Sequence, residues 1–137
     1  MQRREAGMAI LIVEDNPTNA MILKHLARKV TDEEIVIEPD AGKALTMCHN
    51  RLFAMLIVDH ILPGMSGLQF VKAIRMTSRY DEVPVVMVTA DQEPGLREAA
   101  RQGGVTDFLT KPVEAVAFRS LISSCLGHRT DPAALAI

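Results

Sequence analysis

Reactive and charged side chains follow four of the apolar runs in this sequence, directly after the last apolar residue of each run. The residues concerned are Glu14 and Asp15, then Asp59, then Thr89 and Ala90, then Lys111 and Pro112. If the runs are parallel strands, their carboxyl ends meet at one edge of a sheet, which is where ligands bind in open α/β sheets. The three carboxylates and the single lysine are then expected to lie close together.

The chemistry that such a group of residues could perform depends on how its charge is balanced. Three carboxylates and one lysine give a combined charge of about −2, which repels itself unless a cation is present. Mg²⁺ suits this site, because it binds oxygen ligands and keeps several water molecules. With the metal bound, Asp59 could attack a phosphorus atom and form an aspartyl phosphate. The metal and Lys111 would neutralise the charge that develops on the phosphoryl oxygens.

Each of these residues also has a purely structural interpretation. An isolated aspartate after a strand is more often a turn residue than a nucleophile, and Glu14 and Asp15 could simply favour the start of a helix. Thr89 is of a type common in strands, and Lys111 could be a solvated surface lysine. The presence of all of them at one predicted edge favours the chemical interpretation.

Two other classes of protein use a similar sheet. A phosphatase with an aspartate nucleophile needs a second acid two residues later to protonate the leaving group, but Ile61 stands there. A flavin-binding protein needs more aromatic residues and a phosphate-binding loop, and no Gly-Lys-Ser/Thr follows Gly64 or Gly67. His60 is expected to point to the face opposite Asp59, which argues against a catalytic role.

The elements that would position these residues alternate regularly along the chain. Apolar runs predict strands over 8–13, 35–37, 54–58, 84–88 and 107–110. Amphipathic segments predict helices that begin after Asn16, Asp40 and Ser66, and two more over about 91–102 and 113–126, the last ending at Gly127. Apolar strands separated by helices predict an α/β fold, with a parallel sheet covered on both faces. The predicted apolar face of the first helix consists of Ile22, Leu23, Leu26, Ala27 and Val30.

Length and composition limit the remaining possibilities. The 137 residues suffice for one domain, and 48% of them are hydrophobic. A net charge of −2 and a pI of about 6.1 predict no binding to nucleic acid, and no segment approaches the length of a membrane span. Without an export signal, we expect a cytoplasmic protein in which Cys48 and Cys125 are reduced thiols.

Four stretches of the sequence, taken in order, resemble a known family: ILIVEDN, LIVDHILPGMSG, PVVMVTA and TDFLTKP. Together they resemble the response-regulator receiver domain of two-component signalling over residues 8–127, which leaves an extension over 1–7 and a tail or linker over 128–137. The resemblance implies a doubly wound, flavodoxin-like sheet of five parallel strands in the order 2-1-3-4-5, with five helices. It also implies a phosphoaccepting module that acts as a switch more than as an enzyme.

The resemblance implies roles for the acidic residues. Asp59 would be the phosphoacceptor. Mg²⁺ would be bound by Asp15, Asp59 and the backbone carbonyl of Ile61, and Glu14 would act through a metal-bound water. Glu14 stands where the family more often has an aspartate, so its carboxylate reaches further toward that water.

Further roles follow from the same resemblance. Thr89, Ala90 and Lys111 would bind the phosphoryl group, and the peptide bond between Lys111 and Pro112 would be cis. Thr89 and Phe108 would form the switch, in which the aromatic ring turns inward when the threonine moves toward the phosphate.

The lifetime of the phosphate and the partners complete the expectations. Ile61 and Asp91 would border the path of the attacking water and tune the lifetime. The implied phosphodonor is a histidine kinase or a histidine phosphotransfer protein. An output domain or protein partner would contact the face formed by the segments over about 91–102, 107–110 and about 113–126. The stretches NPTN and DFLTKPV are similar to receivers attached to cyclic-dinucleotide phosphodiesterase domains.

Overall fold

The five strands form one parallel sheet at the centre of the molecule. The computed structural model describes residues 9–130, and for residues 128–130 it describes the backbone only. The strands are β1 (Ile10–Val13), β2 (Ile35–Glu38), β3 (Met55–Asp59), β4 (Val85–Thr89) and β5 (Asp107–Thr110). They pair in the order β2-β1-β3-β4-β5, and every pair is parallel. The predicted sheet and strand order are confirmed.

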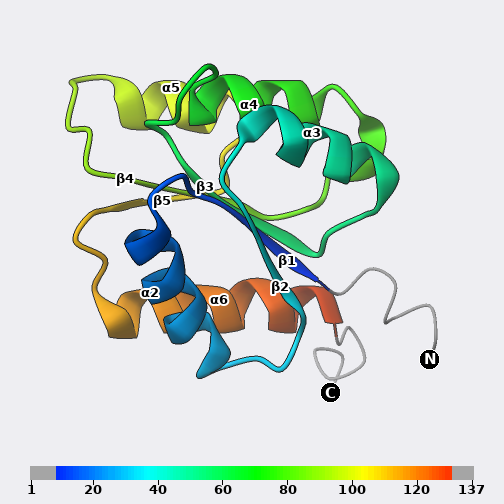
Figure 1. The fold of residues 1–137 in the computed structure, drawn as a ribbon, viewed down its shortest axis with the longest axis vertical. Helices are drawn as coiled ribbons and strands as arrows, with labels where there is room; N and C mark the ends of the chain where they lie inside the picture. The colour runs from blue at the N-terminus through cyan, green and yellow to red at the C-terminus, as the bar shows by residue number, and fades with distance from the viewer. Residues whose placement is uncertain (1–8, 131–137) are drawn as a thin grey trace.

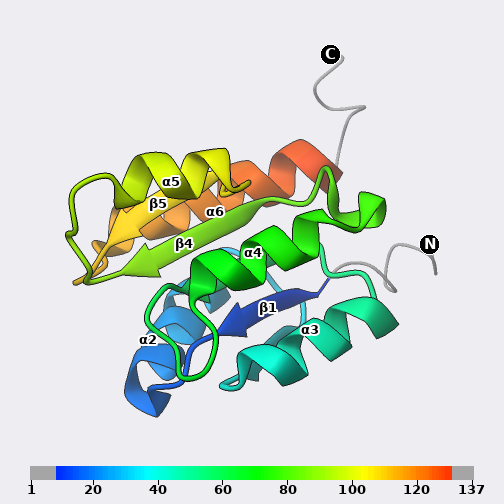
Figure 2. The same ribbon diagram turned by 90° about the horizontal axis from the view of Figure 1, so that it is seen from above.

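Helices cover both faces of the sheet. The helices α2 (Pro17–Arg28) and α6 (Ala115–Thr130) lie on one face (Figure 1). The other face carries α3 (Ala41–Asn50), α4 (Gly67–Arg75) and α5 (Leu96–Gln102), with the short 3₁₀ helix η1 (Ser78–Tyr80) after α4. Figure 2 shows the same layers from above. Because side chains alternate along a strand, the sheet contributes to two apolar cores, one beneath each helical layer.

Three helices begin at the residues that the sequence indicates. The side chains of Asn16 and Asp40 accept hydrogen bonds from backbone N–H groups three residues later, at 2.9 and 3.0 Å. Ser66 forms a reciprocal capping box with Gln69. Each cap satisfies N–H groups that have no partner within the helix, so these starts follow from local chemistry.

Two predicted helices have wrong boundaries. The helix predicted from Asp91 begins only at Leu96, because local bonds give the intervening backbone another conformation. The Asp91 carboxylate accepts from the N–H of Glu93 at 2.9 Å, and Gly95 adopts a positive φ of 87°. The last helix begins two residues later than predicted and continues through Gly127 to Thr130, since a glycine inside a helix costs only about 1 kcal/mol.

The predicted apolar face of the first helix is partly wrong. Leu23 and Ala27 of α2 are buried, but Ile22 and Val30 are exposed. Ala20 takes a buried place that the sequence pattern did not predict. The helix therefore packs through a narrower stripe than its composition indicates, and it leaves apolar side chains in solvent.

A hydrogen-bonded network joins the loops at the amino ends of the strands. The hydroxyl of the buried Tyr80 donates to the carbonyl of Arg51 at 2.8 Å and accepts from the N–H of Phe53 at 3.2 Å. The guanidinium of Arg75 donates to the carbonyl of Gly104 at 2.8 Å and to the carbonyl of Tyr80. These bonds connect three segments that are distant in the sequence, over residues 51–53, 75–80 and around Gly104.

The remaining expectations about the chain concern its thiols and its ends. Cys48 and Cys125 are free and buried, and burial raises the pKa of each thiol to about 11. The predicted extension over 1–7 lies outside the described residues, as does the part of the predicted tail after Thr130. Between residues 9 and 130, no helix combines the length and apolar character needed to cross a membrane.

Candidate functional site

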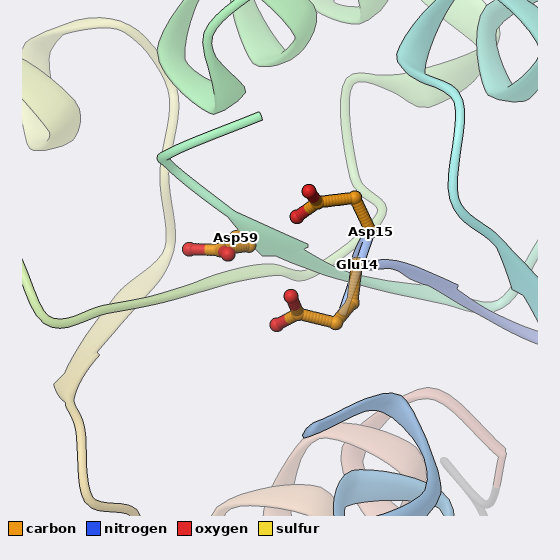
Figure 3. A group of neighbouring side chains, drawn as sticks. All are labelled: Glu14, Asp15 and Asp59. Atoms are coloured by element: carbon orange, nitrogen blue, oxygen red, sulfur yellow. The ribbon is translucent and has the colours of Figure 1, made fainter. Parts of the chain in front are cut away.

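Three carboxylates meet at the carboxyl end of the sheet. The strands β1 and β3 are neighbours and pair Val13 with Val58, so the residues that follow these two positions emerge side by side. Glu14, Asp15 and Asp59 each place a carboxylate oxygen within 4.8 Å of the others. Figure 3 shows the three carboxyl groups together beyond the two strand ends. The structure thus brings together the acidic residues that the sequence singles out.

Lys111 is the cation nearest to this group among the described residues. Its Nζ lies 3.0 Å from Oε1 of Glu14 and 3.3 Å from Oδ2 of Asp59. The lysine follows β5, two strands away from β3, and its long side chain reaches back across the end of β4. The peptide bond between Lys111 and Pro112 is cis.

Burial controls the charge of the site. Glu14 and Asp59 are only 2% and 6% exposed, whereas Asp15 is exposed to solvent. The pKa of Glu14 is raised, chiefly by burial and also by the charge of Asp59, although the hydrogen bonds from Lys111 and from the N–H of Asn16 lower it. For Lys111, burial lowers the pKa, but the bond to Glu14 and the nearby carboxylate charges outweigh burial and raise it overall. The lysine therefore stays protonated near neutral pH.

The donor set fits a hard divalent cation. All three side chains offer oxygen, and the exposed Asp15 opens the group to solvent on one side. Mg²⁺ binds through one or two carboxylates and retains water, so it needs no closed cage of protein ligands. Such an ion would also relieve the repulsion that one lysine leaves uncompensated.

Thr89 and Ala90 lie at the end of β4, the strand next to Asp59. Thr89 is fully buried, and its hydroxyl accepts a hydrogen bond from the N–H of Asp91 at 3.0 Å. Ala90 is exposed. The threonine is therefore bonded to the loop after β4, not to the acidic group.

Three other predicted residues surround the site without joining it. Ile61 is 58% exposed, and its N–H donates to Oδ1 of Asp59 at 3.3 Å. Asp91 is half-buried in the loop after β4, and Phe108 is half-buried on β5. His60 lies away from the carboxylates, and its Nδ1 accepts from the N–H of Leu68 at 3.4 Å.

The sequence interpretation missed two residues near the site. A Cβ at Gly67 would collide with the carbonyl oxygen of Asp59, so only glycine allows α4 to approach β3 so closely. Arg97 of α5 places its guanidinium over the ring of Phe108, 4.6 Å from the centroid. The sequence offers a local indication of the glycine's role, since Gly67 directly follows the helix cap Ser66. Nothing in the sequence indicates the contact between Arg97 and Phe108, because it depends on how α5 packs beside β5.

Comparison with known proteins gives consistent matches. A model of the response regulator receiver domain matches residues 10–123. The chemotaxis protein CheY of Pseudomonas aeruginosa is 35% identical over 115 residues, which cover 84% of this chain and 93% of CheY. The cyclic di-GMP phosphodiesterase response regulator RpfG of Xanthomonas campestris is 30% identical over 93% of this chain, which spans only 34% of RpfG.

Solved structures agree with these matches. A putative response regulator from Chloroflexus aurantiacus superposes with a TM-score of 0.81 at 27% identity, covering 88% of this chain and 98% of that one. The receiver domain of a sensor histidine kinase from Pseudomonas aeruginosa, solved with a magnesium ion coordinated in its active-site cleft, gives a TM-score of 0.78 at 27% identity. It covers 89% of this chain and 99% of that domain.

Proposed function

The chain belongs to the response regulator receiver domain family, and from this premise we propose that Asp59 is the residue that accepts the phosphoryl group. The family is a phosphoaccepting signalling module. The observation that carries the assignment is the position of Asp59, a nearly buried carboxylate beside two other acids and 3.3 Å from Nζ of Lys111. A carboxylate oxygen there can attack phosphorus while a fixed cation faces the incoming charge.

We also propose the metal ligands that the family resemblance implies, and the grouping of the three carboxylates supports them. Asp15, Asp59 and the backbone carbonyl of Ile61 would hold Mg²⁺, and Glu14 would act through a metal-bound water. The ion, when bound, neutralises charge on the phosphoryl oxygens. The buried position of Glu14 fits an indirect role, because its carboxylate is already bonded to Lys111.

The transfer itself is a substitution at phosphorus. An oxygen of Asp59 forms the new O–P bond as the bond from phosphorus to the donor's imidazole nitrogen breaks, and the electron pair of that bond stays on the nitrogen. Lys111 would stabilise one phosphoryl oxygen, and Thr89 and Ala90 would bind another from the end of β4. The phosphoryl group would be lost when a water molecule attacks it. We expect Ile61 and Asp91 to border the path of that water and so to tune the lifetime of the phosphoryl group. This slow hydrolysis is the only catalytic activity that we propose for the chain, and it acts on the chain's own phosphoryl group.

The response to phosphorylation would start at Thr89. Its hydroxyl now holds the N–H of Asp91, and turning it to a phosphoryl oxygen would release that bond. Phe108 lies on the same sheet face, one diagonal step away, because Met87 pairs with Phe108 and Thr89 pairs with Thr110. We propose that an output domain or protein partner detects the change on the face formed by α5, β5 and α6.

The phosphodonor, a histidine kinase or a histidine phosphotransfer protein, must reach Asp59 from the acidic end of the sheet. Ile22 of α2 is 49% exposed and lines a pocket of ≈210 Å³ with Lys111 and Pro112, so an apolar surface borders the acceptor. We expect Ile22→Asp to slow transfer from a kinase that recognises this chain and to leave phosphorylation by acetyl phosphate unchanged. Val30→Asp, beyond the far end of the same helix, is the matched control.

The direct test uses acetyl phosphate and Mg²⁺ with intact-mass measurement. The wild-type chain is expected to gain one labile phosphoryl group, and Asp59→Asn is expected to gain none. Asp32→Asn controls for the loss of an exposed carboxylate far from the site. If Asp59→Asn is phosphorylated to the wild-type yield, Asp59 is not the acceptor.

Two broader expectations belong to this proposal. We take residues 8–127 as the receiver domain, which agrees with a family match over 10–123 but extends slightly beyond it. We also place the protein in the cytoplasm, where kinases of two-component systems have their phosphotransfer domains.

A further inference from the structure

Arg97 covers the aromatic ring that the proposed switch uses. The Cζ atom of its guanidinium lies 4.6 Å from the centroid of the Phe108 ring, within the range of a cation–π interaction. Arg97 is exposed, and within the described residues it forms no salt bridge. Asp91 and Glu93 line a pocket with Arg97, but neither carboxylate lies within ion-pairing distance of the guanidinium.

Open space flanks this contact on both sides. A pocket of ≈380 Å³ lies between the loop after β4 and the contact of Arg97 with Phe108. Its lining includes Asp91, Leu96 and Thr110. A second pocket of ≈210 Å³ lies on the other side, lined in part by Arg101 and Val105. Arg97 and Phe108 line both pockets. The ring thus packs at the margin of the core and is only partly buried, with a hollow on either side.

The segment that carries Arg97 is tied to Thr89. The Thr89 hydroxyl accepts from the N–H of Asp91 at 3.0 Å, and the Asp91 carboxylate accepts from the N–H of Glu93 at 2.9 Å. The helix α5 begins three residues after Glu93, and Arg97 lies in its first turn. A movement of the Thr89 hydroxyl would therefore disturb the backbone that positions Arg97.

We propose that Arg97 is a positioning residue that holds Phe108 at the surface in the unphosphorylated chain and so sets how readily the chain switches. This inference rests on the proposed function, because it takes Phe108 as the switch aromatic. Inward movement of the ring must break its contact with the guanidinium. A cation–π contact at an exposed site shifts such an equilibrium by about two- to fivefold.

The test compares three variants. Arg97→Met keeps the length of the side chain and removes the charge, and Arg97→Lys restores a cation. Arg101→Met is the matched control, because Arg101 lies on the same helix and lines a pocket with Phe108 but pairs with Glu98. Each is titrated with beryllium fluoride, a phosphoryl mimic, at fixed Mg²⁺, and the dissociation constant is measured by calorimetry.

The ring itself provides a second readout. Of the four phenylalanines, Phe53, Phe70 and Phe118 are fully buried and only Phe108 is partly exposed. In protein labelled with fluorophenylalanine, a soluble paramagnet is therefore expected to broaden the ¹⁹F signal of Phe108 alone. Less broadening reports a ring that has turned inward.

The expected result is a dissociation constant two- to fivefold lower in Arg97→Met, an intermediate value in Arg97→Lys and no change in Arg101→Met. The tightening follows because the mimic binds the inward state, whose population rises when the contact is lost. In a Phe108→Leu background, Arg97→Met is expected to have no effect, since the ring through which it acts is absent. The free Arg97→Met protein should also show less broadening at Phe108.

Unchanged or weaker binding in Arg97→Met, or an equal effect in the Phe108→Leu background, would overturn the proposal. Failure of the proposed function looks different: the wild-type chain would not bind the mimic, or Asp59→Asn would bind it equally well. The paramagnetic broadening in the free protein still tests the contact in that case. A general loss of stability cannot imitate the expected result, because it would not tighten binding.

Discussion

The two ends of the sheet treat polar side chains in opposite ways. At the amino end, the Tyr80 hydroxyl and the Arg75 guanidinium bond to backbone groups of neighbouring loops. At the carboxyl end, Glu14, Asp15 and Asp59 crowd together with Lys111 as their only bonded cation among the described residues. One end has its hydrogen bonds satisfied, and the other retains excess negative charge.

This difference separates the groups that stabilise the fold from those that serve its chemistry. A buried hydroxyl with both a donor and acceptor partner contributes to stability, because its loss leaves a backbone group unpaired. Adjacent carboxylates repel each other and are tolerated where a ligand supplies the missing charge. Substitutions at the two ends are therefore expected to act on different properties.

The largest effect is expected on metal binding at the carboxyl end. Asp15→Ala removes an exposed oxygen ligand and should weaken Mg²⁺ binding by about 100-fold. Loss of a residue that only supports a metal ligand can already lower metal affinity by about that factor. Phosphorylation by acetyl phosphate should slow in parallel. Glu93→Ala removes an exposed carboxylate from the loop after β4 and serves as the control in a magnesium titration. Equal affinities in the two variants would contradict the ligand assignment.

The next effect contrasts stability at the two ends. Tyr80→Phe keeps the ring but leaves the Phe53 N–H unpaired, and it should lower the free energy of unfolding by about 1–3 kcal/mol. Asp59→Asn relieves repulsion and should raise that free energy by about 1 kcal/mol in metal-free buffer. Urea unfolding of both variants measures the two changes. If both variants lose stability, the acidic end is not strained by its own charge.

The smallest effect concerns the lifetime of the phosphoryl group. Ile61 is apolar and exposed beside Asp59, so it offers no hydrogen bond to an attacking water. Ile61→Asn should shorten the lifetime by roughly three- to tenfold, because an amide can orient that water. The decay of phosphorylated protein is followed after the donor is removed, at fixed Mg²⁺, with Ile61→Leu as the apolar control. A lifetime equal to or longer than that of the wild type would show that Ile61 does not shield the phosphate.

The sequence predicted the sheet and the meeting of the acidic residues because both follow from local patterns. Apolar runs fix the strands, and parallel pairing then brings Glu14 and Asp59 to the same end. The start of α5 was mispredicted because the bonds of Thr89 and Asp91 compete with the helix. The Tyr80 network was not predicted at all, since it joins segments far apart in the chain.

The order of the strands has a consequence for hydrogen exchange. The strand β3 is paired on both sides and buried along its whole length, whereas β5 has one neighbour and is partly exposed. Amide protons of β3 should exchange only when the whole domain unfolds, and those of β5 through local opening. Asp59 thus ends a strand that is paired on both sides, while Phe108 lies on an edge strand and Lys111 directly follows it. A covalent change at the rigid centre can then alter the fluctuations of the edge without deforming the sheet between them.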